Sequence, residues 1–244
     1  MAAQTASVPS ARRLPVLAWL FSSIGKKTVV ALTGIALVLF VVGHLLGNLS
    51  IFFGPEALNS YAMHLRDLGP LLWVARIGLL VAVGLHIGFT MLVWKENQEA
   101  RPQKYAVAAP MKTTIFARTM RLTGLIVLAF IAFHLAHFTL LIIQPGYASF
   151  RTEIDGREVH DVYRMVVLGF RNPLVSGFYI FSLALVAFHL SHGIGSLFQT
   201  LGLSNKTLRP TFEIAARVIA WALFAGYAAI PVSILLGLGK GIVP

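Results

Sequence analysis

Six of the eight histidines lie inside long apolar stretches, where an imidazole is costly to place. These residues are His44, His86, His134, His137, His189 and His192. Such a histidine either hydrogen-bonds to a neighbouring helix or belongs to a functional site. Neutral imidazole is a natural axial ligand of haem iron, and a bis-histidine site takes one ligand from each of two facing helices. Because four separate stretches carry a histidine, the sequence predicts two such pairs.

Five apolar stretches must position these histidines. They cover residues 28–53, 71–94, 116–143, 173–200 and 213–238. Each has at least the ~20 residues that a helix needs to cross a bilayer. The chain is 57% hydrophobic and 12% charged, a composition that a soluble domain could not keep in solution. No stretch alternates with the period of two that a membrane barrel requires. The sequence therefore predicts an all-α, integral membrane bundle of five helices, with two haem b groups bound between them.

The lack of cysteine limits the chemistry that the chain itself can carry. It excludes disulfides, iron–sulfur ligation and covalent attachment of c-type haem. The formal net charge is +11, but the basic residues sit at the ends of the apolar stretches and form no basic face interleaved with aromatic residues. We therefore expect them to lie at a membrane surface rather than on nucleic acid.

The lysines and arginines also predict how the helices are oriented. Thirteen of the 20 fall on one side of the predicted bundle, and most of the acidic residues fall on the other. Cytoplasmic loops are enriched in Lys and Arg, so the first side is expected to be cytoplasmic. The N-terminus then lies inside and the C-terminus outside, in a bacterial cytoplasmic membrane.

Two regions lie outside this helical pattern. Residues 1–25 contain an Arg-Arg pair before a short apolar run, as in a secretory or twin-arginine signal. A Lys-Lys pair follows without a small-residue cleavage site, so we expect a retained cytoplasmic or interfacial segment ahead of a five-helix cytochrome b domain at 26–244. The longest connection, 144–172, carries seven charges between Arg151 and Arg164 and is expected to form a small structured cap on the outer face.

Depth in the membrane predicts how the histidines pair. With a rise of 1.5 Å per residue, His44 and His134 lie roughly 24–27 Å from the cytoplasmic ends of outward-running helices. His86 and His189 lie roughly 10–15 Å from the cytoplasmic ends of inward-running helices. The arithmetic therefore predicts one pair in the outer half of the bilayer and one in the inner half.

Two further histidines leave the choice of ligands open. His137 and His192 each lie three residues beyond a candidate, on nearly the same face of a regular helix. Spacing alone cannot choose between the members of each couple. No internal repeat is evident beyond a weak likeness between the third and fourth helices.

Several motifs occur in the order found in one family of membrane proteins. They are GKKTVVALTG, GHLLGNL followed by PEALNSYAMHL, RLTG and GFYIFSLALVAFHLSHG. Together with the five-helix layout they extend over about residues 20–240. The chain resembles the single-subunit, dihaem cytochrome b anchors of succinate:quinone oxidoreductases and fumarate reductases, the B-type membrane subunits of complex II.

The resemblance implies one haem ligand on each of the first four helices. The family positions fall on His44 and His86 in the first two. In the third helix the ligand stands ten residues after the glycine of R-x-T-G, which selects His134 rather than His137. In the fourth it follows the GFY stretch, which selects His189. The family pairs the first helix with the third and the second with the fourth.

The resemblance also implies a function. The chain would be the membrane anchor and electron-transfer subunit of a succinate dehydrogenase/fumarate reductase complex. It would pass electrons between an iron–sulfur partner and a membrane quinone, menaquinone by analogy, through two bis-histidine haems. A flavoprotein subunit and an iron–sulfur subunit would dock on the cytoplasmic face. The chain itself would not act on the dicarboxylate but would contribute to the quinone site.

Charged and polar residues near the helix ends are candidates for binding the cofactors. Haem propionates need cationic partners, and the candidates are Arg76 for the outer haem and Arg118 and Arg121 for the inner one. Snorkelling to the interface is the alternative for these arginines. Quinone reduction needs a proton carrier near the outer surface. The candidates in the first outer loop are Glu56, His64 and Asp67. Each could equally be a solvated loop residue. His192 matches a family position where an asparagine can stand, which implies a hydrogen-bonding role.

Two other functions fit parts of the sequence. One is the dihaem gamma subunit of another respiratory oxidoreductase, of the nitrate reductase or formate dehydrogenase type. The other is a haem-free transporter or proton channel whose histidines face the inside of the bundle. The latter predicts no b-type absorption bands.

Overall fold

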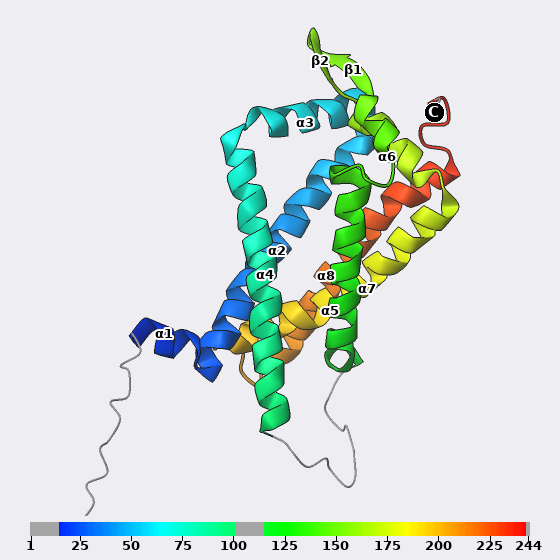
Figure 1. Cartoon of the computed structure of the whole chain (residues 1–244). Helices are drawn as coiled ribbons and strands as arrows, with labels where there is room; N and C mark the ends of the chain where they lie inside the picture. The colour runs from blue at the N-terminus through cyan, green and yellow to red at the C-terminus, as the bar shows by residue number, and fades with distance from the viewer. Residues whose placement is uncertain (1–14, 101–114, 243–244) are drawn as a thin grey trace, which may run out of the picture.

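The computed structural model describes residues 15–100 and 115–242. Within these residues, five helices are long and apolar enough to cross a membrane. They are α2 (Ser23–Asn48), α4 (Pro70–Glu99), α5 (Ile115–His134), α7 (Pro173–Thr200) and α8 (Arg209–Leu236). They stand side by side as one bundle (Figure 1). The predicted all-α, five-helix membrane fold is confirmed, and the chain is a multi-pass membrane protein.

Local signals explain where these helices begin. The Ser22 side chain accepts a hydrogen bond from the backbone N–H of Gly25, so α2 starts before the predicted residue 28. The Asn172 side chain caps α7 in the same way, by accepting from Leu174 and Val175. Proline occupies the first position of both α4 and α7, where its missing N–H costs nothing.

The third membrane helix ends earlier than predicted. Its α-helical part stops at His134 and continues as a π-helical turn, η2 (Leu135–Thr139). Leu141 then adopts a left-handed backbone conformation with φ of 54°. Such a φ cannot continue a right-handed helix, and Pro145 follows shortly afterwards. The predicted end at residue 143 is therefore wrong by four residues.

Packing between the helices is uneven. The closest pair is α7 and α8, where Ala216 and Ala220 are fully buried and let the two backbones approach. The α2 helix packs along α4, and α5 packs along α7. The α4 helix has no fully buried residue, because it packs mainly against α2. The bundle is thus built from two helix pairs, α2–α4 and α5–α7, with α8 behind the second.

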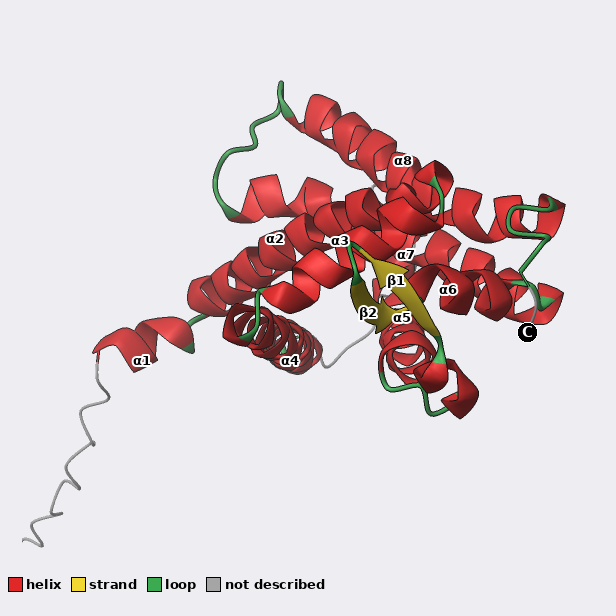
Figure 2. Ribbon diagram, turned by 90° about the horizontal axis from the view of Figure 1, so that it is seen from above, coloured by secondary structure: helices red, strands yellow, loops and turns green. Residues whose placement is uncertain are grey.

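One end of the bundle carries a compact cap. It comprises η1 (Leu49–Phe53), α3 (Pro55–Asp67), η3 (Pro145–Ser149), the antiparallel hairpin β1 (Arg151–Ile154) and β2 (Arg157–His160), and α6 (Val162–Phe170). Seen from above, the hairpin lies over the bundle (Figure 2). The buried Asn59 amide donates to Asp161 and accepts from the N–H of Tyr163, which joins α3 to α6. The predicted structured cap is confirmed, and we call this the cap end and the opposite end the base.

The remaining described helix is short. Helix α1 (Pro15–Leu20) precedes α2 and has no buried residue. It falls within the predicted segment 1–25, most of which lies outside the described residues. The boundary between a segment 1–25 and a domain 26–244 stays a prediction.

Candidate functional site

The base-side histidine of the first helix pair rests in a cradle on α2. The Nδ1 atom of His86 lies 3.1 Å from the carbonyl oxygen of Val30 and 3.2 Å from the hydroxyl of Thr33. Thr33 donates its own proton to the Val29 carbonyl at 2.7 Å, so its oxygen is free to accept from His86. An imidazole that donates from Nδ1 keeps the Nε2 lone pair for another partner.

Glycine makes this cradle possible. A Cβ atom added to Gly34 would lie 3.4 Å from Cε1 of the His86 ring. A larger side chain would push the ring away from α2 and break its hydrogen bonds to the helix. The backbone of α2 therefore sets both the position and the tautomer of His86.

The second helix pair repeats this cradle. Nδ1 of His189 on α7 lies 3.4 Å from the hydroxyl of Thr123 on α5, and the ring lies near the Met120 carbonyl. A Cβ atom on Gly124 would also lie 3.4 Å from Cε1 of His189. The His86 and His189 imidazoles interact electrostatically across the bundle. His86 and His189, the predicted inner pair, thus lie in equivalent cradles on α2 and α5, and we call them the base-side pair.

The sequence contains the same repetition, which the prediction of no further internal repeat did not include. Leu-Thr-Gly occurs at 32–34 and at 122–124, and a histidine follows each glycine after ten residues. His86 and His189 each stand 16 residues after the proline that opens their helix. The expectation of no repeat beyond the third and fourth helices is therefore wrong. The α2–α4 pair corresponds to the α5–α7 pair, and matching L-T-G to histidine spacings was the signal that could have found it.

The two histidines that follow the glycines form a second pair nearer the cap. The ring centroids of His44 and His134 are 5.9 Å apart, with ring planes at 81°. Nδ1 of His44 lies 3.3 Å from the amide nitrogen of Asn48, one helical turn further on. Nδ1 of His134 lies 3.5 Å from the hydroxyl of Tyr179 on α7. The predicted outer pair is also brought together, and we call it the cap-side pair.

The π-helical turn separates His137 from His134. This turn closes with a hydrogen bond of 2.7 Å from Leu140 N to Leu135 O, five residues back, and so widens the helix. His137 is only 1% exposed, donates to or accepts from Tyr179 at 3.1 Å, and packs against Phe138. Its Nε2 atom is buried without a partner. The His134 ring is only half-buried, so of the two it is the one with access to a ligand.

The predicted arginines do not meet the histidine pairs. Arg76 is exposed, and its guanidinium lies 5.1 Å from the Trp73 ring. Arg121 lies 5.3 Å from the Trp94 ring, which joins α5 to α4 at the base. Arg118 is exposed. Their exposure is compatible with the alternative that these arginines snorkel to the membrane interface.

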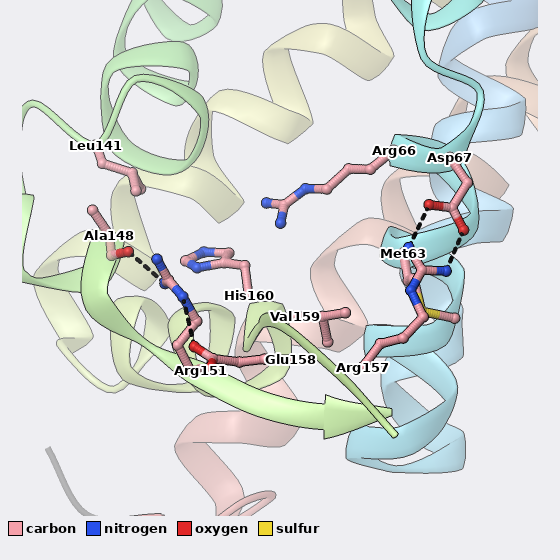
Figure 3. Close-up of a pocket in the computed structure, with 10 residues that line it drawn as sticks. All are labelled: Met63, Arg66, Asp67, Leu141, Ala148, Arg151, Arg157, Glu158, Val159 and His160. Atoms are coloured by element: carbon pink, nitrogen blue, oxygen red, sulfur yellow. Dashed lines mark hydrogen bonds and ion pairs between the residues drawn. The ribbon is translucent and has the colours of Figure 1, made fainter. Parts of the chain in front are cut away.

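The three predicted proton carriers lie on α3 in the cap. Glu56 stands in its first turn, and Nδ1 of His64 lies 2.7 Å from the Ser60 carbonyl. Asp67 accepts two hydrogen bonds of 2.9 Å from Arg157 of the hairpin, as Figure 3 shows. These hydrogen bonds hold the pKa of Asp67 below its usual value. Asp67 therefore links α3 to the β1–β2 hairpin through Arg157.

The described residues contain no group of three or more histidine or acidic side chains that could hold a free metal ion. The potential ligands come as two pairs of histidines, each shared between two helices. His192 lies one turn beyond the base-side pair and interacts electrostatically with Glu213 of α8.

Comparison with known proteins identifies the family of this chain. A family model described as the succinate dehydrogenase/fumarate reductase transmembrane subunit matches residues 95–225, which is more than half of the chain. No curated protein and no solved structure shows significant similarity. The matched region contains α5, α7 and most of α8, with one member of each histidine pair. The chain therefore belongs to the family of succinate dehydrogenase/fumarate reductase transmembrane subunits.

Proposed function

We propose that this membrane anchor conducts electrons between an iron–sulfur partner and a membrane quinone through two haem b groups. His86 and His189 would be the axial ligands of one haem, and His44 and His134 those of the other. The observation that carries the proposal is the repeated placement of half-buried histidines in two facing pairs. Haem iron held in this way supplies one-electron chemistry without a change of ligands.

The residues present fit such a cofactor. Metal–imidazole bonds are about 2 Å long, so two imidazoles that share one metal ion would have ring centroids no more than about 6 Å apart. The centroid separation of 5.9 Å between His44 and His134 agrees with this distance. A histidine that ligates a metal usually donates its other ring N–H to a carbonyl. His86 makes this bond to Val30, and the Met120 carbonyl lies near the equivalent ring of His189.

The chain's other residues would orient and insulate these ligands. Thr33 and Thr123 fix the rotation of the base-side rings, and Tyr179 joins His134 to His137. His137 is closed off by aromatic rings, so we assign it a supporting hydrogen bond. His192 would act in the same way at the base. Arg76, Arg118 and Arg121 remain our candidates for the propionates and would have to leave their exposed positions.

The orientation and partners follow from the distribution of charge. We propose that the base faces the cytoplasm of a bacterial cell, because Lys and Arg are concentrated there. A flavoprotein subunit with the dicarboxylate site and an iron–sulfur subunit would dock on this basic face. The cap, and with it the C-terminus, would then lie outside. The family match favours this complex over a gamma subunit of the nitrate reductase or formate dehydrogenase type.

The quinone, menaquinone by analogy, would react near the cap, where a proton carrier must be within reach. Glu56 and His64 form no ion pair among the described residues, and both stand on α3. Asp67 would first have to leave Arg157. We therefore rank Glu56 and His64 ahead of Asp67 as carriers.

The test is the haem content of the purified complex. A pyridine haemochrome assay should give two protohaem groups per chain, and the complex should contain flavin and oxidise succinate or reduce fumarate. One haem or none would refute the two-pair arrangement. A haem-free preparation with intact helices would favour a transporter instead.

A further inference from the structure

The cap contains a cavity whose charge is not balanced. It has a volume of about 400 Å³ and lies between the end of α3, the end of the third membrane helix and the hairpin. Its lining includes Arg66, Arg151, Arg157 and His160, whereas its acidic residues are Asp67 and Glu158. Both acids are already engaged, the first by Arg157 at 2.9 Å and the second by Arg151 at 3.4 Å.

Of the arginines that line the cavity, Arg66 is the one without an acidic partner among the described residues. Its side chain forms no hydrogen bond or ion pair within the described part of the chain, and Figure 3 shows its guanidinium aimed into the cavity toward His160 and Arg151. The Arg66 side chain is exposed, but partial desolvation, together with the charges of Arg76 and Arg151, lowers its pKa. An anion between these groups would relieve the repulsion and could accept the paired hydrogen bonds that a guanidinium offers.

His160 is set up as a second donor or acceptor. Its Nδ1 atom lies 3.1 Å from the Phe150 carbonyl, which fixes the ring against η3. Its other ring nitrogen is therefore available for a molecule in the cavity.

The cavity also lies beside an apolar surface. Leu141 forms part of its lining. The neighbouring side chains of Leu68, Leu71 and Leu140 are 46%, 60% and 63% exposed. An occupant with an anionic head and apolar tails would satisfy both surfaces at once. A soluble anion would leave the apolar rim bare.

We propose that this cavity binds the phosphate of an anionic phospholipid head group, with Arg66 as its main ligand. The lipid tails would run along the exposed leucines beside it. The head group would lie between α3, the hairpin and the end of the third membrane helix, and so would link the cap to the two helix pairs.

The test is lipid binding to the delipidated complex, measured by native mass spectrometry with phosphatidylglycerol as the probe. Phosphatidylcholine with the same acyl chains serves as the zwitterionic control. Arg66→Gln should weaken phosphatidylglycerol binding about tenfold, since charge-assisted hydrogen bonds are lost. Lys240→Gln removes an exposed cation that does not line the cavity and should leave binding unchanged.

The haem content of the same samples separates this inference from the proposed function. Weaker lipid binding by Arg66→Gln with two haems retained supports the lipid site. Equal binding by Arg66→Gln and the wild type overturns it, as does equal binding of the two lipids. A shifted haem spectrum without loss of lipid also overturns it, in favour of a haem propionate as the occupant.

Discussion

The α2–α4 and α5–α7 pairs hold their base-side histidines with the same residues and their cap-side histidines with different ones. At the base, each imidazole meets a threonine hydroxyl, a backbone carbonyl and a glycine on the facing helix. Near the cap, His44 meets Asn48 of its own helix, whereas His134 meets Tyr179 of α7. The repeated contact is the one where two helices must approach each other closely, and the contacts that differ lie beside the cap. The comparison suggests that close backbone approach restricts sequence more than side-chain hydrogen bonding does.

Replacing the histidines proposed as haem ligands should have the largest effect. It tests whether the two histidine pairs hold haem independently of each other. His86→Leu or His189→Leu should remove the base-side haem alone, and His44→Leu or His134→Leu the cap-side haem alone. Low-temperature spectra of each variant should therefore show one of two b-type bands. His137→Leu and His192→Leu should keep both. Loss of the same band in the His44 and His86 variants would contradict the pairing.

The glycines test the cradle itself. Gly34→Leu and Gly124→Leu should displace the base-side rings, because even a Cβ atom would lie 3.4 Å from them. Overpacking of this kind costs about 1–3 kcal/mol. We expect partial or complete loss of the base-side haem, with the cap-side band intact. Gly78→Leu and Gly177→Leu are matched controls, since nothing lies within 4 Å of a Cβ atom at either position. Equal haem loss in the controls would mean that the effect is one of helix insertion.

Removing a single hydrogen bond should have a smaller effect and should show whether the two histidine pairs respond independently. Thr123→Val keeps the shape of the side chain but removes the contact to His189, and Tyr179→Phe removes the contact to His134. A hydrogen bond of this type contributes about 1 kcal/mol. Redox titration should show the first variant shifting only the base-side haem and the second only the cap-side haem. A shift of both by either variant would indicate that the pairs are coupled.

The smallest effect concerns the cap and its dependence on pH. Arg157 lowers the pKa of Asp67 below its ordinary value of 3.8, so the ion pair stabilises the folded cap above that pH. This contribution should be lost as the pH falls through the lowered pKa, when Asp67 becomes protonated. Hydrogen exchange of the hairpin amides should accelerate there in the wild type. Asp67→Asn should exchange faster at neutral pH and lack this transition, while the haem bands of both proteins stay the same.

Much of the fold could be predicted because the membrane imposes it. A span of apolar residues has few ways to satisfy its backbone in lipid, so the five helices follow from hydropathy. The depth of each histidine in the membrane could be predicted because an α-helix rises by a fixed distance per residue. The structure brings the rings of His44 and His134 together, as depth predicts, whereas the assignment of the four histidines as haem ligands stays a prediction.

Other features depend on contacts that hydropathy does not encode. The π-helical turn at Leu135–Thr139 includes His137 but not His134, so the spacing of a regular helix does not apply to these two residues, whose rings both contact the Tyr179 hydroxyl. Asp67 was predicted as a proton carrier or a solvated loop residue, and its partner Arg157 lies 90 residues further along the chain. The hairpin is polar and short, and a long-range ion pair of this kind has no local sequence signal. Whether Glu56, His64 or Asp67 carries protons stays a prediction.

The buried Lys26 at the start of α2 forms an ion pair with Glu96 at the end of α4. The equivalent positions of the other half are Phe116 and Gln199, so this contact was not duplicated. The difference has a consequence for biogenesis, because the ribosome delivers α2 and α4 to the membrane before any later helix exists. The α2–α4 pair contains both partners of the ion pair, so these two helices can associate as soon as both are in the membrane. The α5–α7 pair has Phe116 and Gln199 at these positions, which cannot form an ion pair, and it gains its most extensive neighbour, α8, only when the last stretch of the chain is synthesised.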